Sequence, residues 1–226
     1  MATAHMLQVF CDDQGHFGDA ASIIIDEEKR IPDNERQVIA RTLATGETVF
    51  VNSLKDASIS VMHPQGEIDF AGVGVLGAAW LLAKLQNTPL DKLNGRGGTI
   101  KTWQDGDLTW IETDSTTLPA WNYKQESSVE AIENVRLTET SAIQHTMIWA
   151  WANETDGIIR ARTFAADWGI PEAMGNGSGA MLLAKKLNRN IEVHHGKGAV
   201  IFAKPNSGDL VSVGGRVHQE QDRLIS

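Results

Sequence analysis

The feature that most limits how this chain can fold is a glycine-rich segment that occurs twice. A shift of 101 residues (182 − 81) places residues 72–85 on residues 173–186 with six identities in fourteen positions. Composition alone predicts about one identity, so we interpret the two copies as an internal duplication. In each copy, glycines precede a helix that is apolar around its whole circumference, and such a helix must be buried. The sequence therefore predicts two similar units, each with a central buried helix.

Strands are predicted before and after these helices. Alternating apolar residues favour strands at 47–52, 58–63, 145–152 and 157–164. The dipeptide Asp105-Gly106 marks the turn of a hairpin over 99–113. Residues 86–98 are polar and indicate a linker, and residues 114–130 are poor in aliphatic side chains and indicate a crossover between two halves.

The predicted fold class is α+β, with two similar halves that each wrap a mostly antiparallel sheet around a central apolar helix. We place the N-terminal half at residues 6–115, with its helix at 74–85. We place the C-terminal half at residues 116–226, with its helix at 177–187.

Composition restricts the partners and the compartment. The net charge is −9, with 20 basic and 29 acidic residues and no basic cluster, which argues against nucleic acid or an anionic membrane as a partner. The longest apolar run, residues 71–83, is too short to span a bilayer. The single cysteine, Cys11, is consistent with a reducing cytoplasm. Residues 1–5 resemble a leader ahead of Met6 and are expected to lie outside the fold.

Residues 72–77 match the pattern G-x-G-x-x-G, which invites a dinucleotide-binding interpretation. The context argues against it, because residues 86–98 form a polar linker where a Rossmann unit needs another parallel strand. Two interpretations remain open. Either the glycines allow a buried helix to pack closely, or the amino ends of both helices face one cleft and bind a small anion such as a carboxylate.

Glu47 begins an otherwise uncharged strand, and the sequence alone leaves its role open. An acid at a strand end usually faces solvent, but at an interdomain cleft partial burial would raise its pKa and suit it to proton transfer. Neither glycine loop contains a cysteine, which excludes a racemase that uses a pair of thiols. His63, His194 and His195 have no partners at metal-ligand spacing, so we interpret them as surface or strand residues and predict no metal site.

Four motifs, in one order along the chain, carry a resemblance to a known family. They are Val9-Phe10 with Phe17-Gly18-Asp19-Ala20, Glu47-Thr48-Val49-Phe50-Val51, residues 70–77 (FAGVGVLG), and Arg162-Thr163-Phe164 followed by residues 169–178 (GIPEAMGNGS). They resemble V-F with F-x-G-N-P, S-E-T-x-F-V, F-A-G-H-P-T-L-G, and R-x-F with G-I-x-E-D-P-A-T-G-S of the PhzF (phenazine-biosynthesis F) family. That family has the diaminopimelate-epimerase-like fold, and the resemblance covers the chain from about Leu7 to Val217.

The resemblance implies a catalytic role for Glu47, which falls on the proton-shuttling glutamate of the family. It also implies that the acid group of the substrate binds to backbone amides of the two glycine loops, with no cofactor and no metal. The substrate-binding residues expected on this basis are Asp19, Gly72, Val73, Gly74, Ala173, Asn176, Gly177 and Ser178. The resemblance further suggests a homodimer.

Two positions depart from the family motifs. The histidine of G-H-P is Val73 in this chain, and the aspartate of E-D-P is Ala173. Both usual polar partners of Glu47 are therefore replaced by apolar residues. A polar substrate group that faced them would remain unpaired at a cost of about 1–3 kcal/mol each, which argues against the substrate of phenazine biosynthesis itself.

We expect a cofactor-independent isomerase, with a role in secondary metabolism, in which Glu47 moves a proton on a small unsaturated or cyclic carboxylic acid. One alternative is a non-catalytic binding or accessory protein for a small acid, which the apolar residues Val73 and Ala173 favour. Another is a pericyclic or rearrangement catalyst of natural-product biosynthesis that uses the cleft mainly for its shape.

Overall fold

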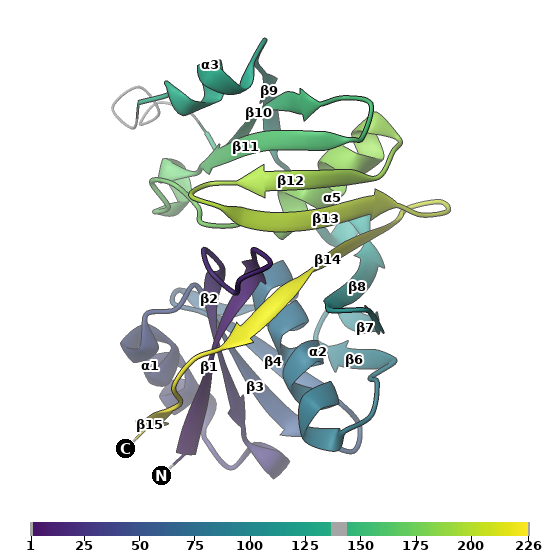
Figure 1. Cartoon of the computed structure of the whole chain (residues 1–226). Helices are drawn as coiled ribbons and strands as arrows, with labels where there is room; N and C mark the ends of the chain where they lie inside the picture. The colour runs from purple at the N-terminus through teal and green to yellow at the C-terminus, as the bar shows by residue number, and fades with distance from the viewer. Residues whose placement is uncertain (1, 137–143, 226) are drawn as a thin grey trace.

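The computed structural model describes residues 2–136 and 144–225, and its elements form two stacked groups (Figure 1). The N-terminal half, drawn below, contains β1 (Ala2–Cys11), β2 (Asp19–Ile25), α1 (Asp33–Leu43), β3 (Glu47–Ser53), β4 (Ser58–His63), β5 (Gly66–Ile68), α2 (Gly72–Gln86), β6 (Lys92–Gly95), β7 (Gly98–Asp105) and β8 (Leu108–Asp114). The C-terminal half, drawn above, contains β9 (Asn122–Gln125), α3 (Val129–Glu133), β10 (Thr146–Asn153), β11 (Ile158–Phe164), α5 (Gly177–Leu187), β12 (Ile191–His195) and β13 (Ala199–Pro205). Two strands follow, β14 (Leu210–Gln219) and β15 (Arg223–Ile225).

The two halves repeat one pattern of strand pairing. In the first half, β2 is parallel to β3, β3 is antiparallel to β4, β4 is parallel to β6, and β6 is antiparallel to β7. The same order of parallel and antiparallel pairs runs through β9, β10, β11, β12 and β13. Equivalent strands begin about 101 residues apart, as at Gly98 and Ala199 (199 − 98). The predicted α+β fold with two similar halves is therefore confirmed.

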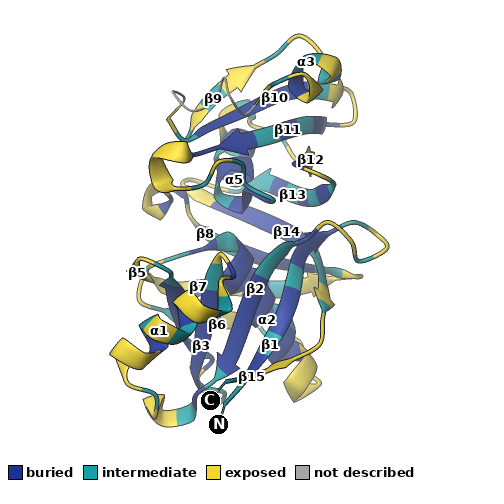
Figure 2. Ribbon diagram, turned by 90° about the vertical axis from the view of Figure 1, so that its left-hand side faces the viewer, coloured by how far each residue is buried: buried dark blue, intermediate teal, exposed yellow. Residues whose placement is uncertain are grey.

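Strand β14 links the halves. It is antiparallel to β13 in the C-terminal half and to both β8 and β1 in the N-terminal half. Through these pairings the first sheet closes into a ring of strands, and α2 packs against β1, β2, β3, β6, β8 and β14 inside it. Residues Val73–Ala83 of α2 are buried except for Trp80, as Figure 2 illustrates, because the helix has no polar face to present to water.

Two local predictions are wrong. Residues 1–5 were expected to lie outside the fold, but Ala2–His5 form the first part of β1, where Ala4 pairs with both Ile24 and Arg223. Met1 lies outside the described residues. Residues 86–98 were expected to be a linker, but they contain β6, which pairs with β7. In both cases the pattern of the segment itself is weak, and pairing with other strands stabilises it: β1 pairs with β2 and β15, and β6 pairs with β7 and with β4.

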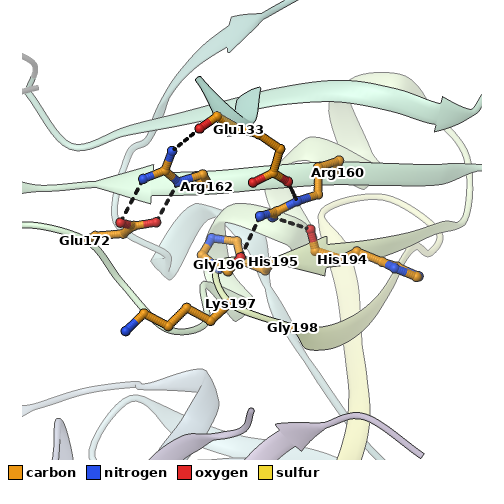
Figure 3. Close-up of a pocket in the computed structure, with 9 residues that line it drawn as sticks. All are labelled: Glu133, Arg160, Arg162, Glu172, His194, His195, Gly196, Lys197 and Gly198. Atoms are coloured by element: carbon orange, nitrogen blue, oxygen red, sulfur yellow. Dashed lines mark hydrogen bonds and ion pairs between the residues drawn. The ribbon is translucent and has the colours of Figure 1, made fainter. Parts of the chain in front are cut away.

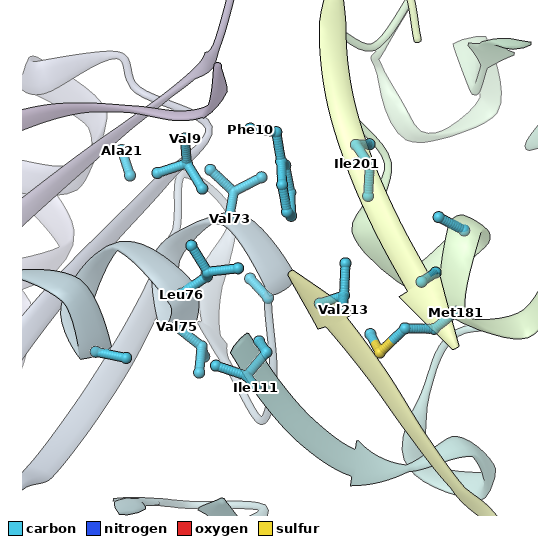
Figure 4. Packing of buried hydrophobic residues seen from close by; sticks show 14 of the residues in the cluster. Val9, Phe10, Ala21, Val73, Val75, Leu76, Ile111, Met181, Ile201 and Val213 are labelled. Atoms are coloured by element: carbon cyan, nitrogen blue, oxygen red, sulfur yellow. The ribbon is translucent and has the colours of Figure 1, made fainter. Parts of the chain in front are cut away.

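An apolar core runs from one half into the other. In Figure 4, Val73 and Leu76 on α2 face Val213 on β14, and the ring of Phe10 lies between the halves. All four side chains are buried. Phe10 has a positive φ of 66° at the end of β1, where the register to β14 is interrupted by a bulge. The starts of α2 and α5 therefore lie next to one apolar core that both halves share.

Candidate functional site

The start of α2 lies directly against the start of β3. A Cβ atom placed on Gly74 would lie 2.9 Å from Cγ2 of Val49 and 3.2 Å from Cβ of Glu47, so only glycine allows this close approach. The N-cap residue, Ala71, has no side chain that could accept a hydrogen bond from the first amides of the helix. The positive end of the α2 dipole therefore has no side-chain cap, and the carboxylate of Glu47 lies next to it.

The start of α5 is held by side-chain hydrogen bonds. The Asn176 Oδ1 atom accepts a hydrogen bond from the Gly179 amide at 2.8 Å, and its Nδ2 donates to Oγ1 of Thr163 at 3.2 Å. The Ser178 Oγ atom accepts a hydrogen bond from Nε1 of Trp121 at 2.9 Å. Asn176 and Ser178, which were predicted to bind substrate, thus have structural partners in this half of the chain.

The two helix starts meet. A Cβ atom placed on Gly72 would lie 3.6 Å from the Cα atom of Gly177 and 3.9 Å from the amide nitrogen of Ser178. The positive ends of two helix dipoles that lie this close together favour an anionic group beside them. We refer to this region, with Asp19, Glu47, residues 72–74 and residues 175–178, as the helix junction.

Glu47 is partly buried at the helix junction. Burial raises the pKa of its carboxyl group to about 8, the negative charge of Asp19 contributes to the rise, and the backbone amide of Gly74 counteracts it. A carboxyl group with a pKa near neutrality can both donate and accept a proton under physiological conditions.

Asp19 is also partly buried and opens β2, the parallel neighbour of β3. Its Oδ2 atom accepts a hydrogen bond from the backbone amide of Gly175, just before α5, at 3.2 Å. Burial raises the pKa of Asp19 to about 6, and the amides of Gly175 and Ala20 oppose that rise. Asp19 therefore connects the N-terminal half to the start of the C-terminal helix.

The remaining predicted site residues, Val73 and Ala173, are apolar. Val73 is 6 % exposed in the first turn of α2. Ala173 is partly buried, and its amide donates to the carbonyl of Thr163 at 2.9 Å. The structure thus brings Glu47, Asp19 and both glycine loops together and leaves apolar groups at positions 73 and 173.

Sequence reasoning missed a buried histidine that supports the junction. His195 is fully buried, its Nδ1 lies 3.0 Å from the carbonyl of Met174, and its Nε2 lies 2.8 Å from Oγ1 of Thr163. The tautomer with a proton on Nδ1 satisfies both contacts. Burial lowers the pKa of His195 to about 4, so the ring is neutral near pH 7. The pair His194-His195 on a predicted strand gave no indication of which ring is buried.

A separate pocket of about 610 Å³ lies on the C-terminal half (Figure 3). Its two arginines have partners: Arg162 forms a bidentate pair with Glu172 at 2.7 and 3.0 Å, and Arg160 pairs with Glu133 at 2.5 Å and donates to backbone carbonyls. Because these guanidinium groups are already paired with carboxylates, they offer little attraction to an anion. It contains none of the predicted catalytic or substrate-binding residues.

Within residues 2–136 and 144–225, no group of three or more His, Cys, Asp or Glu side chains is arranged to hold a metal ion. In the same part of the chain, no helix has the length and apolar character needed to cross a bilayer.

The duplicated sheet-and-helix architecture of this chain is similar to that of several solved structures. Among solved structures, a phenazine biosynthesis protein of the PhzF family from Enterococcus faecalis has a TM-score of 0.81 to this chain, with 16% identity and coverage of 98% of both chains. A hydroxyproline epimerase from Agrobacterium vitis, solved with trans-4-hydroxy-L-proline bound, has a TM-score of 0.61, with 10% identity over 98% of this chain and 90% of its own. The chain therefore has the PhzF-like fold.

Sequence comparison gives a partial match. An uncharacterized isomerase from Pasteurella multocida is 30% identical over 106 residues, which are 45% of this chain and 36% of that relative. No family model matches the sequence. The similarity to solved structures thus shows the fold of this chain.

Proposed function

We propose that this protein is a cofactor-independent isomerase or epimerase of the PhzF family, and that Glu47 moves a proton on a small carboxylic acid. The observation that carries the proposal is the position of Glu47, partly buried beside the meeting point of two helix amino ends. The raised pKa of its carboxyl group, about 8, supports an acid-base role. The isomerase and epimerase relatives support the reaction class.

The helix junction would bind the substrate by its acid group. The backbone amides of Gly72 and Val73 begin α2, and those of Gly177 and Ser178 begin α5, so the positive ends of both helix dipoles favour a carboxylate there. The same amides would stabilise the additional negative charge that forms on this group when a neighbouring carbon loses its proton. Binding and catalysis would thus use the same donors.

Glu47 would transfer the proton. In its charged form the carboxylate takes a proton from a carbon activated by the bound acid group, and the electron pair of the C–H bond moves into the delocalised system. The protonated carboxyl group then returns the proton to the same or another carbon. The buried neighbours Val49 and Val73 exclude water, which protects the anionic intermediate.

The apolar residues at positions 73 and 173 suggest the substrate class. Val73 and Ala173 offer no hydrogen bond to a substituent, and an unpaired polar group there costs about 1–3 kcal/mol. We therefore propose a small unsaturated or cyclic acid whose face toward residues 73 and 173 is apolar, and a place for the reaction in secondary metabolism.

The test is an NMR screen of small cyclic and unsaturated acids, including proline and 4-hydroxyproline, in deuterated buffer. We expect deuterium to enter one acid with the wild-type protein, and Glu47→Gln to lower this rate by about 10²-fold or more. Glu67→Gln, which changes an exposed glutamate of the same half, is the matched control and should keep the wild-type rate. Full turnover by Glu47→Gln would contradict the assignment.

A binding or accessory role is the second candidate, favoured by the apolar residues Val73 and Ala173. It predicts that an acid from the screen raises the melting temperature of the wild-type protein and of Glu47→Gln equally, while no deuterium enters that acid.

A further inference from the structure

Glu47 has a second carboxylate beside it. Asp19 and Glu47 are the first residues of two neighbouring parallel strands, in a register that pairs Ala21 with Glu47. Because side chains alternate along a strand, Asp19 lies on the same sheet face as Ala21, and paired residues of neighbouring strands share a face. Asp19 and Glu47 are therefore diagonal neighbours on one face of the sheet, where the two strands begin.

Each carboxyl group is anchored at a different helix. Glu47 lies against Gly74 in the first turn of α2, and Asp19 accepts a hydrogen bond from the Gly175 amide just before α5. Because a Cβ atom on Gly72 would lie only 3.6 Å from the Cα atom of Gly177, the two helix starts are in contact. A substrate held there by its acid group would have an acidic side chain of the protein on the α2 side and another on the α5 side.

In the part of the chain that the structure describes, no basic side chain forms an ion pair with either group. The groups that act on the pair from neighbouring elements are the backbone amides of Ala20, Gly74 and Gly175. The nearby thiol of Cys11 has its pKa raised to about 11 by burial, so it stays uncharged near pH 7.

We propose that Asp19 is a second catalytic residue, which exchanges protons with the substrate in partnership with Glu47. This inference rests on the isomerase function proposed above. One carboxylate takes the proton of the substrate C–H bond and becomes neutral, the electron pair delocalises into the acid group, and the other carboxyl group gives its proton to the receiving carbon. The pair ends with one proton, as it began, so no other reactant is needed.

The electrostatics of the pair agree with this division of labour. The pKa of Asp19 is raised to about 6 and that of Glu47 to about 8, and the charge of Asp19 is one cause of the second rise. Two carboxyl groups that interact in this way hold one proton between them over the interval between the two values. In that interval one of the two groups is charged and can act as the base, while the other is protonated and can act as the acid.

The first experiment measures the pair without a substrate. The carboxyl carbons are labelled with ¹³C and followed by NMR from pH 4 to pH 10 in the wild-type protein, Asp19→Asn and Asp13→Asn. Asparagine keeps an oxygen for the Gly175 amide but removes the charge, so the Glu47 midpoint should fall by about one pH unit. Asp13→Asn removes an exposed charge six positions away and should leave the midpoint unchanged. An unchanged midpoint in Asp19→Asn would overturn the inference.

The second experiment uses an acid identified in the deuterium screen. Wild-type kcat should follow a bell-shaped pH profile with limbs near the two pKa values, and Asp19→Asn should lose about 10²-fold in kcat with little change in KM and no bell. If Asp19→Asn keeps the wild-type kcat and profile while Glu47→Gln is inactive, Asp19 is not a catalytic residue and the isomerase function stands. If both variants retain full turnover, the proposed function fails as well.

Discussion

The two halves of this protein share one scaffold but differ in their charges. Glu47 opens β3 and pairs with Ala21 on the parallel neighbour, and Thr146 opens β10 and pairs with Asn122 in the same way. The acid of the first half is thus replaced by a buried threonine, whose hydroxyl donates to the carbonyl of Gln144. Duplication supplied two equivalent strand ends, and only the N-terminal copy carries an acid.

The amino ends of the two central helices also differ, because only the helix of the C-terminal half has a side-chain cap. The first amides of α5 are capped by Asn176, and the Gly175 amide before them donates to Asp19. The N-cap of α2, Ala71, provides no side-chain acceptor. The comparison teaches that the C-terminal half contributes a helix end held by side-chain hydrogen bonds, and the N-terminal half contributes the two acidic side chains and a helix end without a side-chain cap. Four changes test this division, from the largest expected effect to the smallest.

Asn176→Ala should have the largest effect on stability. It removes the cap of α5, leaves the Gly179 amide without its acceptor and removes one of the two partners of the Thr163 hydroxyl, so the free energy of unfolding should fall by about 2–3 kcal/mol. Urea denaturation measures this loss. Ser178→Ala removes a hydroxyl that donates to Asn176 Oδ1 and accepts from Trp121, but it leaves the hydrogen bond from the Gly179 amide to Asn176 in place and should cost less than half as much. Equal losses would mean that α5 does not depend on its cap.

Gly74→Ala should lower stability by creating a steric clash between α2 and β3. The added methyl group would lie 2.9 Å from Val49, and overpacking of this kind costs about 1–3 kcal/mol in unfolding free energy. Gly72→Ala is the matched control, because its methyl group would meet Gly177 at an ordinary contact distance of 3.6 Å. Thermal denaturation of both variants tests whether close approach is needed at position 74 in particular.

Glu47→Gln should change the pH dependence of stability. Because the pKa of Glu47 is about 8 in the folded chain and 4.5 ordinarily, the unfolded chain releases this proton first. The contribution of Glu47 to stability is therefore fully present below pH 4.5 and is lost as the pH rises through 8. Relative to wild type, Glu47→Gln should gain at least about 1.4 kcal/mol between pH 4.5 and pH 9, the equivalent of one pKa unit. Glu67→Gln should show no such gain in urea titrations at the two pH values.

Ala71→Ser should have the smallest effect on stability, and it removes the difference in capping between α2 and α5 directly. Serine at this extended N-cap position can accept a hydrogen bond from the first turn of α2, which should stabilise the fold by about 0.5–1 kcal/mol. The new cap would also compete with a bound carboxylate. We expect a raised melting temperature together with weaker binding of any acid that the wild-type protein recognises, measured by calorimetry.

Much of the architecture could be predicted because the duplicated helices are apolar on all sides, which leaves burial within a sheet as their only stable environment. The strand at 58–63 was also predictable, since Ile59 and Val61 alternate with polar neighbours. The return of β14 to β1 was not, because nothing near residues 210–219 specifies a partner two hundred positions earlier.

The site was predictable only in part. The motifs indicated Glu47, but whether an acid at a strand end faces water or protein depends on what packs over it, here Gly74. Asp19 was expected only as a binding residue, because its proximity to Glu47 requires β2 and β3 to be parallel neighbours. The burial of His195 depends on the loop before α5, which lies about twenty residues away in the sequence.

Strand β14 has a consequence for how the molecule is made. The ring of strands around α2 is complete only when Leu210–Gln219 has been inserted between β8 and β1. Most of the polypeptide must therefore leave the ribosome before the N-terminal half can close. Until β14 has been synthesised, the apolar helix α2 is only partly covered by strands. We therefore expect chaperones to bind nascent chains that are stalled before residue 210 more than they bind full-length chains.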